Sequence, residues 1–197
     1  MNKLMGFLEL KEMNIPSISW KEFSKDTVLD EKTLWTIRTA VYKGSDHNLP
    51  RKVGVDAKEA MLFGRQMLDR LNGKGMVIYY PYFIADKSGT LNASSEKVVI
   101  EAVKADLWNM VTNSDLDVTI IHENGEVYYK GDREFLSADE QEQLMKRVPA
   151  VKRAFRDDLL EGKGALLEWS FARNCNSEKE PVGDPYLVFY EARTIKC

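Results

Sequence analysis

Two strand-like runs near the C-terminal end limit the fold most, because each carries a carboxylate among apolar residues. The first run is LLEWSFA, residues 166–172, and the second is YLVFYEAR, residues 186–193. Branched and aromatic side chains at a period of two predict β-strands. The loop between them is rich in Asn, Ser, Glu, Lys, Pro and Gly, so the two runs are expected to pair.

The carboxylates in these runs are Glu168 and Glu191. An unpaired charge on a buried strand is costly, so each needs a partner such as Arg193 or a bound cation. Paired strands would bring both carboxylates over one pocket, with Arg193 one step along the same face. This set suits a magnesium-bound polyphosphate, and a structural Glu–Arg pair inside a sheet is the alternative.

Composition excludes some classes of protein. The 197 residues suffice for one core or for two small lobes around a cleft. A net charge of −3 gives no general reason to expect nucleic acid or an anionic membrane as partner. No apolar run approaches the roughly 20 residues that span a bilayer. Glu9 and Lys11 come too early for a secretion signal, and Cys175 and Cys197 form no disulfide framework, so we expect a cytoplasmic protein.

Capping signals and apolar spacing predict several helices. Asp56 is a good N-cap with Glu59 three residues on, and Ser137 with Glu140 forms a capping box. Pro149 opens a further helix that Gly162 closes. The expected helices cover residues 3–13, 57–71, 106–111, 138–147 and 149–161.

Strand signals fill the intervening segments. The run GMVIYYPYFIA, residues 75–85, is a strand that Pro81 must interrupt, because proline cannot donate to a sheet. Asn124-Gly125 between two alternating runs predicts a hairpin. Residues 42–54 are interpreted as a loop that closes over an anionic ligand or is a solvated turn. Residues 87–90 are interpreted as a turn. Further strands are expected at residues 34–41, 98–102, 117–122 and 127–130.

This order of elements predicts an α+β protein, a single domain of two lobes with antiparallel sheets. The small N-terminal lobe is expected at about residues 1–74 and the C-terminal lobe at about residues 75–197.

Several segments then match one family pattern in the same order. Residues 3–16 are similar to the signature K-G-x-N-L-x-E-M-x-x-x-G-x-P, with the glycine after the lysine replaced. The chain resembles the ATP-grasp nucleotide-binding domain of the phosphoenolpyruvate synthase and pyruvate phosphate dikinase family. The other matching segments are residues 37–40 (V-R-S-S), 45–50 (an acidic loop ending in L-P), 76–83 (the hinge strand at adenine), 88–91 (S-G-V-x-F-T), 167–170 (I-E-W-A) and 190–194 (L-Q-x-R-P).

The resemblance implies an ATP site with magnesium. It places Lys3, Arg38 and Arg193 on the ATP phosphates, the two arginines in catalysis, and Glu168 and Glu191 on the metal. The residues that would receive adenine are Met76, Ile78, Tyr79, Tyr80 and Tyr82.

Two further residues are weighed beside that set. The position of Lys87 in its loop makes it another phosphate candidate. Glu101 is either a structural acid or a further ligand.

The chain also departs from the family. The segment between Pro16 and Arg38 is shorter, Thr-Ala follows Arg38 instead of two serines, and Glu191 replaces a glutamine. No part of the chain matches the swivelling phosphohistidine domain or the pyruvate-binding barrel. The two histidines are His47, in the expected lid, and His122, on a hairpin strand.

Three functions follow from the resemblance. The leading one is phosphoryl transfer from Mg-ATP to an unidentified acceptor, a small molecule or a histidine on a separate protein. The alternatives are a non-catalytic nucleotide-binding or regulatory module and an ATP-dependent carboxylate–amine ligase, which Glu191 favours. A dikinase-like reaction would yield AMP, and a ligase would yield ADP.

Overall fold

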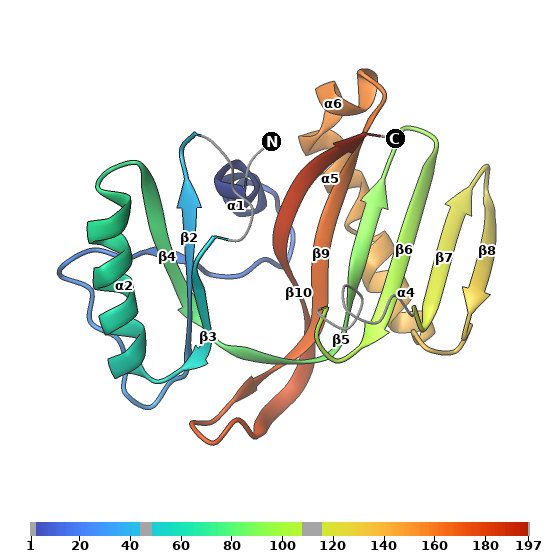
Figure 1. Ribbon diagram of the computed structural model, residues 1–197. Helices are drawn as coiled ribbons and strands as arrows, with labels where there is room; N and C mark the ends of the chain where they lie inside the picture. Colours follow the sequence, from blue (N-terminus) through green and yellow to red (C-terminus); the bar gives the residue numbers. More distant parts are fainter. Residues whose placement is uncertain (1–2, 44–48, 108–115, 197) are drawn as a thin grey trace.

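The computed structural model describes residues 3–43, 49–107 and 116–196. It contains two antiparallel sheets with flanking helices, which confirms the expected α+β class with two lobes (Figure 1). Within these residues, no helix combines the length and the apolar character needed to cross a lipid bilayer.

The smaller sheet has four strands in the order β1-β4-β2-β3. One helix, α2 (Ala57–Leu71), packs on one of its faces. Asp56 accepts from the backbone N–H of Glu59, and Asn72 ends the helix in the left-handed conformation, as its capping signals predict. The four strands are β1 (Lys21–Glu22), β2 (Trp35–Val41), β3 (Arg51–Val55) and β4 (Gly75–Pro81).

The interpretation of residues 42–54 as a loop was wrong for its last part. β3 begins at Arg51 and pairs antiparallel with β2, so that Arg51 lies opposite Arg38. Gly54 has a φ of 62° and occupies a buried position against the Tyr82 ring. A glycine in this conformation explains why the segment reads as a turn although it belongs to a strand.

The larger sheet has six strands in the order β10-β9-β5-β6-β7-β8. Helices α4 (Ala138–Met145), α5 (Val148–Ala154) and α6 (Arg156–Leu160) lie along one of its faces (Figure 1). The strands are β5 (Phe83–Ala93), β6 (Lys97–Lys104), β7 (Val118–Glu123), β8 (Glu126–Gly131), β9 (Lys163–Cys175) and β10 (Pro181–Lys196).

Local signals account for several of these elements. Ser137 and Glu140 form the capping box of α4, and Asn124-Gly125 has positive φ angles at both positions between β7 and β8. The single helix expected after Pro149 is divided at Phe155 into α5 and α6.

The turn expected at residues 87–90 is wrong, because these residues lie inside β5. A Cβ atom at Gly89 would overlap the carbonyl oxygen of Glu101 and lie 2.5 Å from the indole of Trp169. The glycine therefore serves close packing of this indole across the sheet rather than a change of chain direction.

The chain changes sheets at Tyr82, between β4 and β5, because Pro81 ends the hinge strand as expected. The Tyr82 N–H donates to the carbonyl of Leu34 at 2.8 Å. The first 74 residues therefore do not hold the whole smaller sheet, since its strand β4 follows them.

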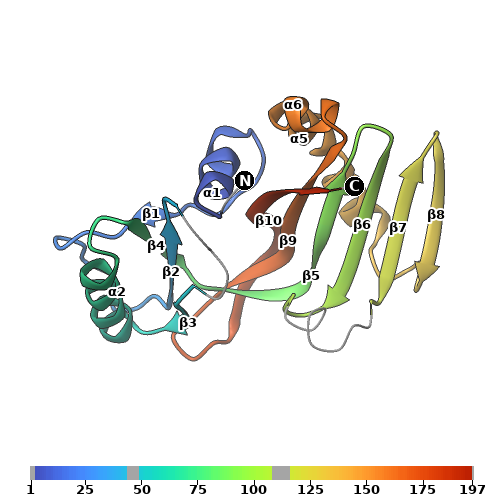
Figure 2. The same cartoon turned by 45° about the horizontal axis from the view of Figure 1, so that its top comes forward.

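Helix α1 (Lys3–Glu12) lies between the two sheets (Figures 1 and 2). A Cβ atom at Gly6 would overlap the carbonyl oxygen of Ala192, so the helix axis lies unusually close to β10. Phe7 joins a buried apolar cluster with side chains from both sheets, namely Ile18, Ile78, Tyr80, Ala172 and Val188. This cluster joins the lobes and fixes the relative positions of β2, β4 and β10.

Candidate functional site

A row of polar side chains crosses the larger sheet on the face opposite helices α4–α6, here called the polar face. In register, Glu191 lies beside Glu168, Glu168 beside Thr90, and Thr90 beside Glu101. The alternate residues of β9, such as Trp169, point into the core under the helices. The prediction that the C-terminal strands pair with both carboxylates side by side is therefore confirmed.

Arg193 belongs to the same face, one step along β10. Its Nη2 atom lies 3.9 Å from Oε1 of Glu168, and its side chain is 50% exposed. An ion pair this long and this exposed contributes little to stability. The arginine is therefore positioned to turn toward a ligand at small energetic cost.

A β-bulge shapes β10 beside these carboxylates. The register shifts between Phe189 and Glu191, which leaves Tyr190 as an extra residue beside Phe83. Burial raises the pKa of the Tyr190 hydroxyl, the Glu168 carboxylate raises it further, and a hydrogen bond with Ser170 acts in the opposite direction. A neutral phenol therefore lies next to Glu168.

The strongest contact of the site joins the two lobes. Nη2 of Arg38, on β2, lies 2.6 Å from Oε2 of Glu191, on β10, and both side chains are 10% exposed or less. The guanidinium also lies over the ring of Phe7, 5.1 Å from its centroid. The predicted phosphate ligand and the predicted metal ligand thus contact each other directly.

Tyr80 completes this buried group. Burial alone would lower the pKa of Arg38, but Tyr80 and Glu191 outweigh burial, so the pKa is raised and the guanidinium stays charged. Burial raises the pKa of the Tyr80 hydroxyl, which Arg38 and Arg51 partly oppose. The site therefore combines a charged pair with a neutral phenol.

Arg51 and Tyr190 are candidate site residues that the sequence interpretation did not select. Arg51 lies opposite Arg38, close enough to influence Tyr80, but it fell in a segment interpreted as a loop. The alternation of Val53 and Val55 after it was the available signal, and it is a short one. Tyr190 had no signal beyond its place next to Glu191.

The predicted adenine-lining residues are divided between the two faces of β4. Ile78 and Tyr80 are buried in the cluster that joins the lobes, and Met76 packs against it. Tyr79 points the other way, into the core under α2, with its ring centroid 5.6 Å from that of Trp35. Tyr82 lies between the sheets.

Tyr79 therefore does not share a face with Arg38, because successive strand residues alternate.

Lys87 does not join the carboxylates of the polar face. Its Nζ atom lies 2.7 Å from Oε2 of Glu140 and donates to the carbonyl of Phe135 at 2.8 Å. Glu140 belongs to α4, so this lysine lies on the helix-covered face of the sheet. The structure thus separates Lys87 from Glu168 and Glu191.

Lys3 is the first residue of α1. It precedes Gly6 by three residues, so the two residues share a side of the helix, and Gly6 contacts Ala192 between Glu191 and Arg193. Its backbone position thus agrees with a place near the carboxylates, while its role on phosphates stays a prediction.

The remaining candidates do not extend the site. Oγ1 of Thr90 donates to Oε2 of Glu101 at 3.0 Å. His122 lies on β7, and burial lowers its pKa. His47 falls outside the described residues.

In the described part of the chain, no three His, Cys, Asp or Glu side chains form a group that could hold a metal ion. A magnesium ion here would therefore take one or two carboxylates, with its other ligands from water or phosphate, as is common for Mg²⁺.

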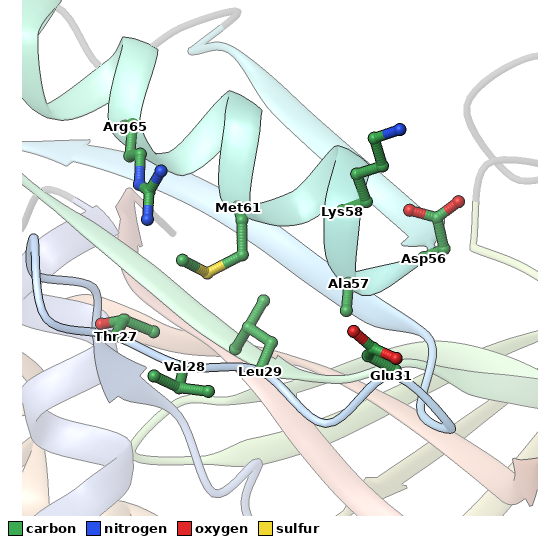
Figure 3. Close-up of a pocket in the computed structure, with 9 residues that line it drawn as sticks. All are labelled: Thr27, Val28, Leu29, Glu31, Asp56, Ala57, Lys58, Met61 and Arg65. Atoms are coloured by element: carbon green, nitrogen blue, oxygen red, sulfur yellow. The ribbon is translucent and has the colours of Figure 1, made fainter.

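A pocket of about 640 Å³ lies elsewhere, between α2 and the segment before β2 (Figure 3). No predicted site residue lines it. Its lining residues are Thr27, Val28, Leu29, Glu31, Asp56, Ala57, Lys58, Met61 and Arg65.

Comparison with known proteins gives the fold its name. No known family model and no curated protein sequence matches the chain. Among solved structures, it is similar to the D-alanine–D-alanine ligase of Helicobacter pylori, with a TM-score of 0.51, 12% identity, and coverage of 98% of this chain and 50% of the ligase. It is also similar to the D-cycloserine synthetase DcsG, with a TM-score of 0.50, 10% identity, and coverage of 100% and 62%.

These two similarities show that the chain has the ATP-grasp fold, as its sequence resemblance implies. They do not extend to the phosphoenolpyruvate synthase family specifically. The chain spans 50% and 62% of the length of the two structures.

Proposed function

We propose that the chain binds Mg-ATP where its two lobes meet on the polar face. The observation that carries this proposal is the convergence of Arg38, from the smaller sheet, with Glu191, Glu168 and Arg193, from the larger one. Carboxylate oxygens suit Mg²⁺, and the planar forks of arginine suit phosphate.

The Arg38–Glu191 pair must rearrange for this binding. A buried ion pair is costly to open unless each charge gains a new partner. The triphosphate offers anionic oxygens to Arg38, and the magnesium ion offers positive charge to Glu191. Both charges therefore exchange one partner for another, and neither is left uncompensated.

The reaction that we propose is ATP-dependent activation of a carboxylate followed by attack of an amine. The carboxylate oxygen forms a bond to the γ-phosphorus while the β–γ bond breaks, and ADP leaves. The amine then bonds to the acyl carbon, phosphate leaves, and the nitrogen loses a proton. Support comes from the names of the two similar structures, a ligase and a synthetase, and from a carboxylate at Glu191.

Phosphoryl transfer to a separate acceptor is the second candidate. The order of motifs shared with the dikinase family, from Lys3 to Arg193, favours it. In either reaction, catalysis depends on fixed cations around the transferred phosphoryl group. Arg38 and Arg193, with Arg51 nearby, would supply this charge.

A non-catalytic nucleotide-binding module is the third candidate. The specific observation that favours it is that Arg38 and Glu191 already neutralise each other in a buried pair. Such a module would bind Mg-ATP without turnover.

Titration calorimetry with Mg-ATP tests the binding. We expect Glu168→Ala and Glu191→Gln to weaken binding by at least about tenfold, because each removes a charged metal ligand. The matched control is Glu142→Ala, an exposed acid on α4. Wild-type protein that binds no Mg-ATP would overturn the proposal.

Product analysis separates the three candidates. ADP formed only with both a carboxylate and an amine supports ligation, and AMP or a labelled partner protein supports the dikinase-like route. Binding without turnover in any mixture supports the non-catalytic module.

A further inference from the structure

The two edges of the larger sheet are treated differently. At one edge, α1 packs so closely on β10 that Gly6 meets the Ala192 carbonyl. At the other edge, β8 is the last strand, and β7 is its neighbour in the sheet (Figure 1). Five of the six residues of β8 are exposed.

The hairpin geometry shows which backbone groups of β8 point outward. Its turn has two residues, Asn124 and Gly125, so the flanking pair Glu123 and Glu126 exchanges hydrogen bonds. Hydrogen-bonded pairs then alternate along the ladder. This alternation agrees with the bond from the Asp132 N–H to the Asp117 carbonyl, one residue beyond the strand end.

It follows that the N–H and C=O groups of Val127 and Tyr129 point away from β7, toward the edge. β8 contains no proline, and its pairing with β7 shows no bulge. The usual devices that prevent pairing at an edge are thus reduced here to the charges of Glu126 and Lys130.

These two charges have opposite signs and lie at equal distances from Tyr128. We propose that β8 pairs antiparallel with β8 of a second copy of this chain, around a two-fold axis at Tyr128. In that register, Glu126 of each copy faces Lys130 of the other in a non-hydrogen-bonded pair, where side chains are closest.

The same register satisfies the rest of the strand. Val127 faces Tyr129 of the other copy in a hydrogen-bonded pair, so the outward backbone groups of both residues gain partners. The two Tyr128 rings, each 50% exposed in the single chain, meet on the axis. Tyr129 is already held by a hydrogen bond from its hydroxyl to Gln141 of α4, which keeps the strand in place for pairing.

Both polar faces then lie on the same side of one continuous sheet. This follows because Lys130 stands in the same cross-strand row as Glu101 and Glu168, through Thr119 and Thr90. A strand pair of this length buries less than the roughly 1,200 Å² of a standard interface, so the dimer is weak and forms at high concentration.

Charge reversal tests this register. In Glu126→Lys and in Lys130→Glu, each attractive contact becomes repulsive twice in the dimer, and we expect the dissociation constant to rise at least about tenfold. The double variant Glu126→Lys/Lys130→Glu restores opposite signs and should recover dimerisation. Analytical ultracentrifugation over a wide concentration range measures each constant.

Mixing the two single variants gives the sharpest measurement. Each pairs poorly with itself, but a mixed dimer has opposite charges at both contacts, so the mixture should form a heterodimer. The matched controls are Glu142→Lys and Lys146→Glu, which reverse an exposed pair on α4. Circular dichroism checks that each variant is folded.

Two results would overturn the proposal. One is a wild-type chain that stays monomeric up to its solubility limit. The other is a dimer whose dissociation constant changes as little with the β8 reversals as with the α4 controls.

Discussion

The two faces of the larger sheet are formed by the same strands, but their residues serve different ends. On the face under α4–α6, Trp169, Leu91 and Ile100 are fully buried among apolar side chains. On the polar face, the same strands carry Glu168 and Glu191, one of which is buried against a guanidinium from the other lobe.

The difference shows how one sheet separates stability from binding. Apolar burial on the helix-covered face fixes the strand register, and this register places the carboxylates of the polar face side by side. Charges can then be held in a buried position that would be unfavourable by itself. Substitutions on the first face should therefore affect folding, and those on the second should affect binding.

The largest effect is expected for Trp169→Ala. The indole is fully buried, so its removal should lower the free energy of unfolding by about 3–5 kcal/mol. Urea denaturation measures the change. The control is Leu166→Ala on the polar face, where the side chain is partly exposed and the loss should be smaller. Equal losses at both positions would break the distinction between the faces.

Next in size is Arg38→Met, which leaves the Glu191 carboxylate buried without the guanidinium. We expect the free energy of unfolding to fall by about 3 kcal/mol. In the double variant Arg38→Met/Glu191→Met, most of this loss should be recovered, because no isolated charge remains. A double variant that loses the sum of both single effects would argue against a coupled pair.

A comparison of Lys87→Met with Arg193→Met sharpens the separation further. Lys87 binds Glu140 on the helix-covered face, so its loss should cost about 1 kcal/mol of stability and leave Mg-ATP affinity unchanged. Arg193→Met should weaken Mg-ATP binding with little change in stability, since its side chain is 50% exposed. Calorimetry and denaturation together measure both quantities. The opposite pattern would show that the faces are not separate.

The smallest effect concerns pH. His122 lies opposite Val98 in the ladder, on the helix-covered side, and burial lowers its pKa. The unfolded chain therefore binds a proton more readily than the folded one, so stability falls as the pH drops below about 6.5. In His122→Leu, the loss of stability between neutral and mildly acidic pH should be smaller. Denaturation midpoints that change identically in both proteins would contradict this.

Sequence patterns predicted most of the fold because the signals were local. The caps at Asp56 and Ser137, the turn at Asn124 and the break at Pro81 each act within a few residues of the chain. The cross-strand neighbours Glu168 and Glu191 were also predictable, since alternation fixes which side chains share a face.

Three-dimensional packing determined the parts that the patterns missed. Gly89 was interpreted as a turn residue, but the Trp169 indole, eighty residues away in sequence, explains it. Lys87 depended on that expected turn, and its partner Glu140 lies on a helix far along the chain. The contact between Arg38 and Glu191 required knowledge of how the lobes meet, which no local signal carries.

The close approach of Gly6 to Ala192 has a consequence for biosynthesis. The first helix cannot dock until the last strand has left the ribosome, so its apolar side chain Phe7 stays unburied during nearly all of translation. Such a long-range contact closes slowly and only at the end of folding. The nascent chain therefore exposes this helix to chaperones until its synthesis is almost complete.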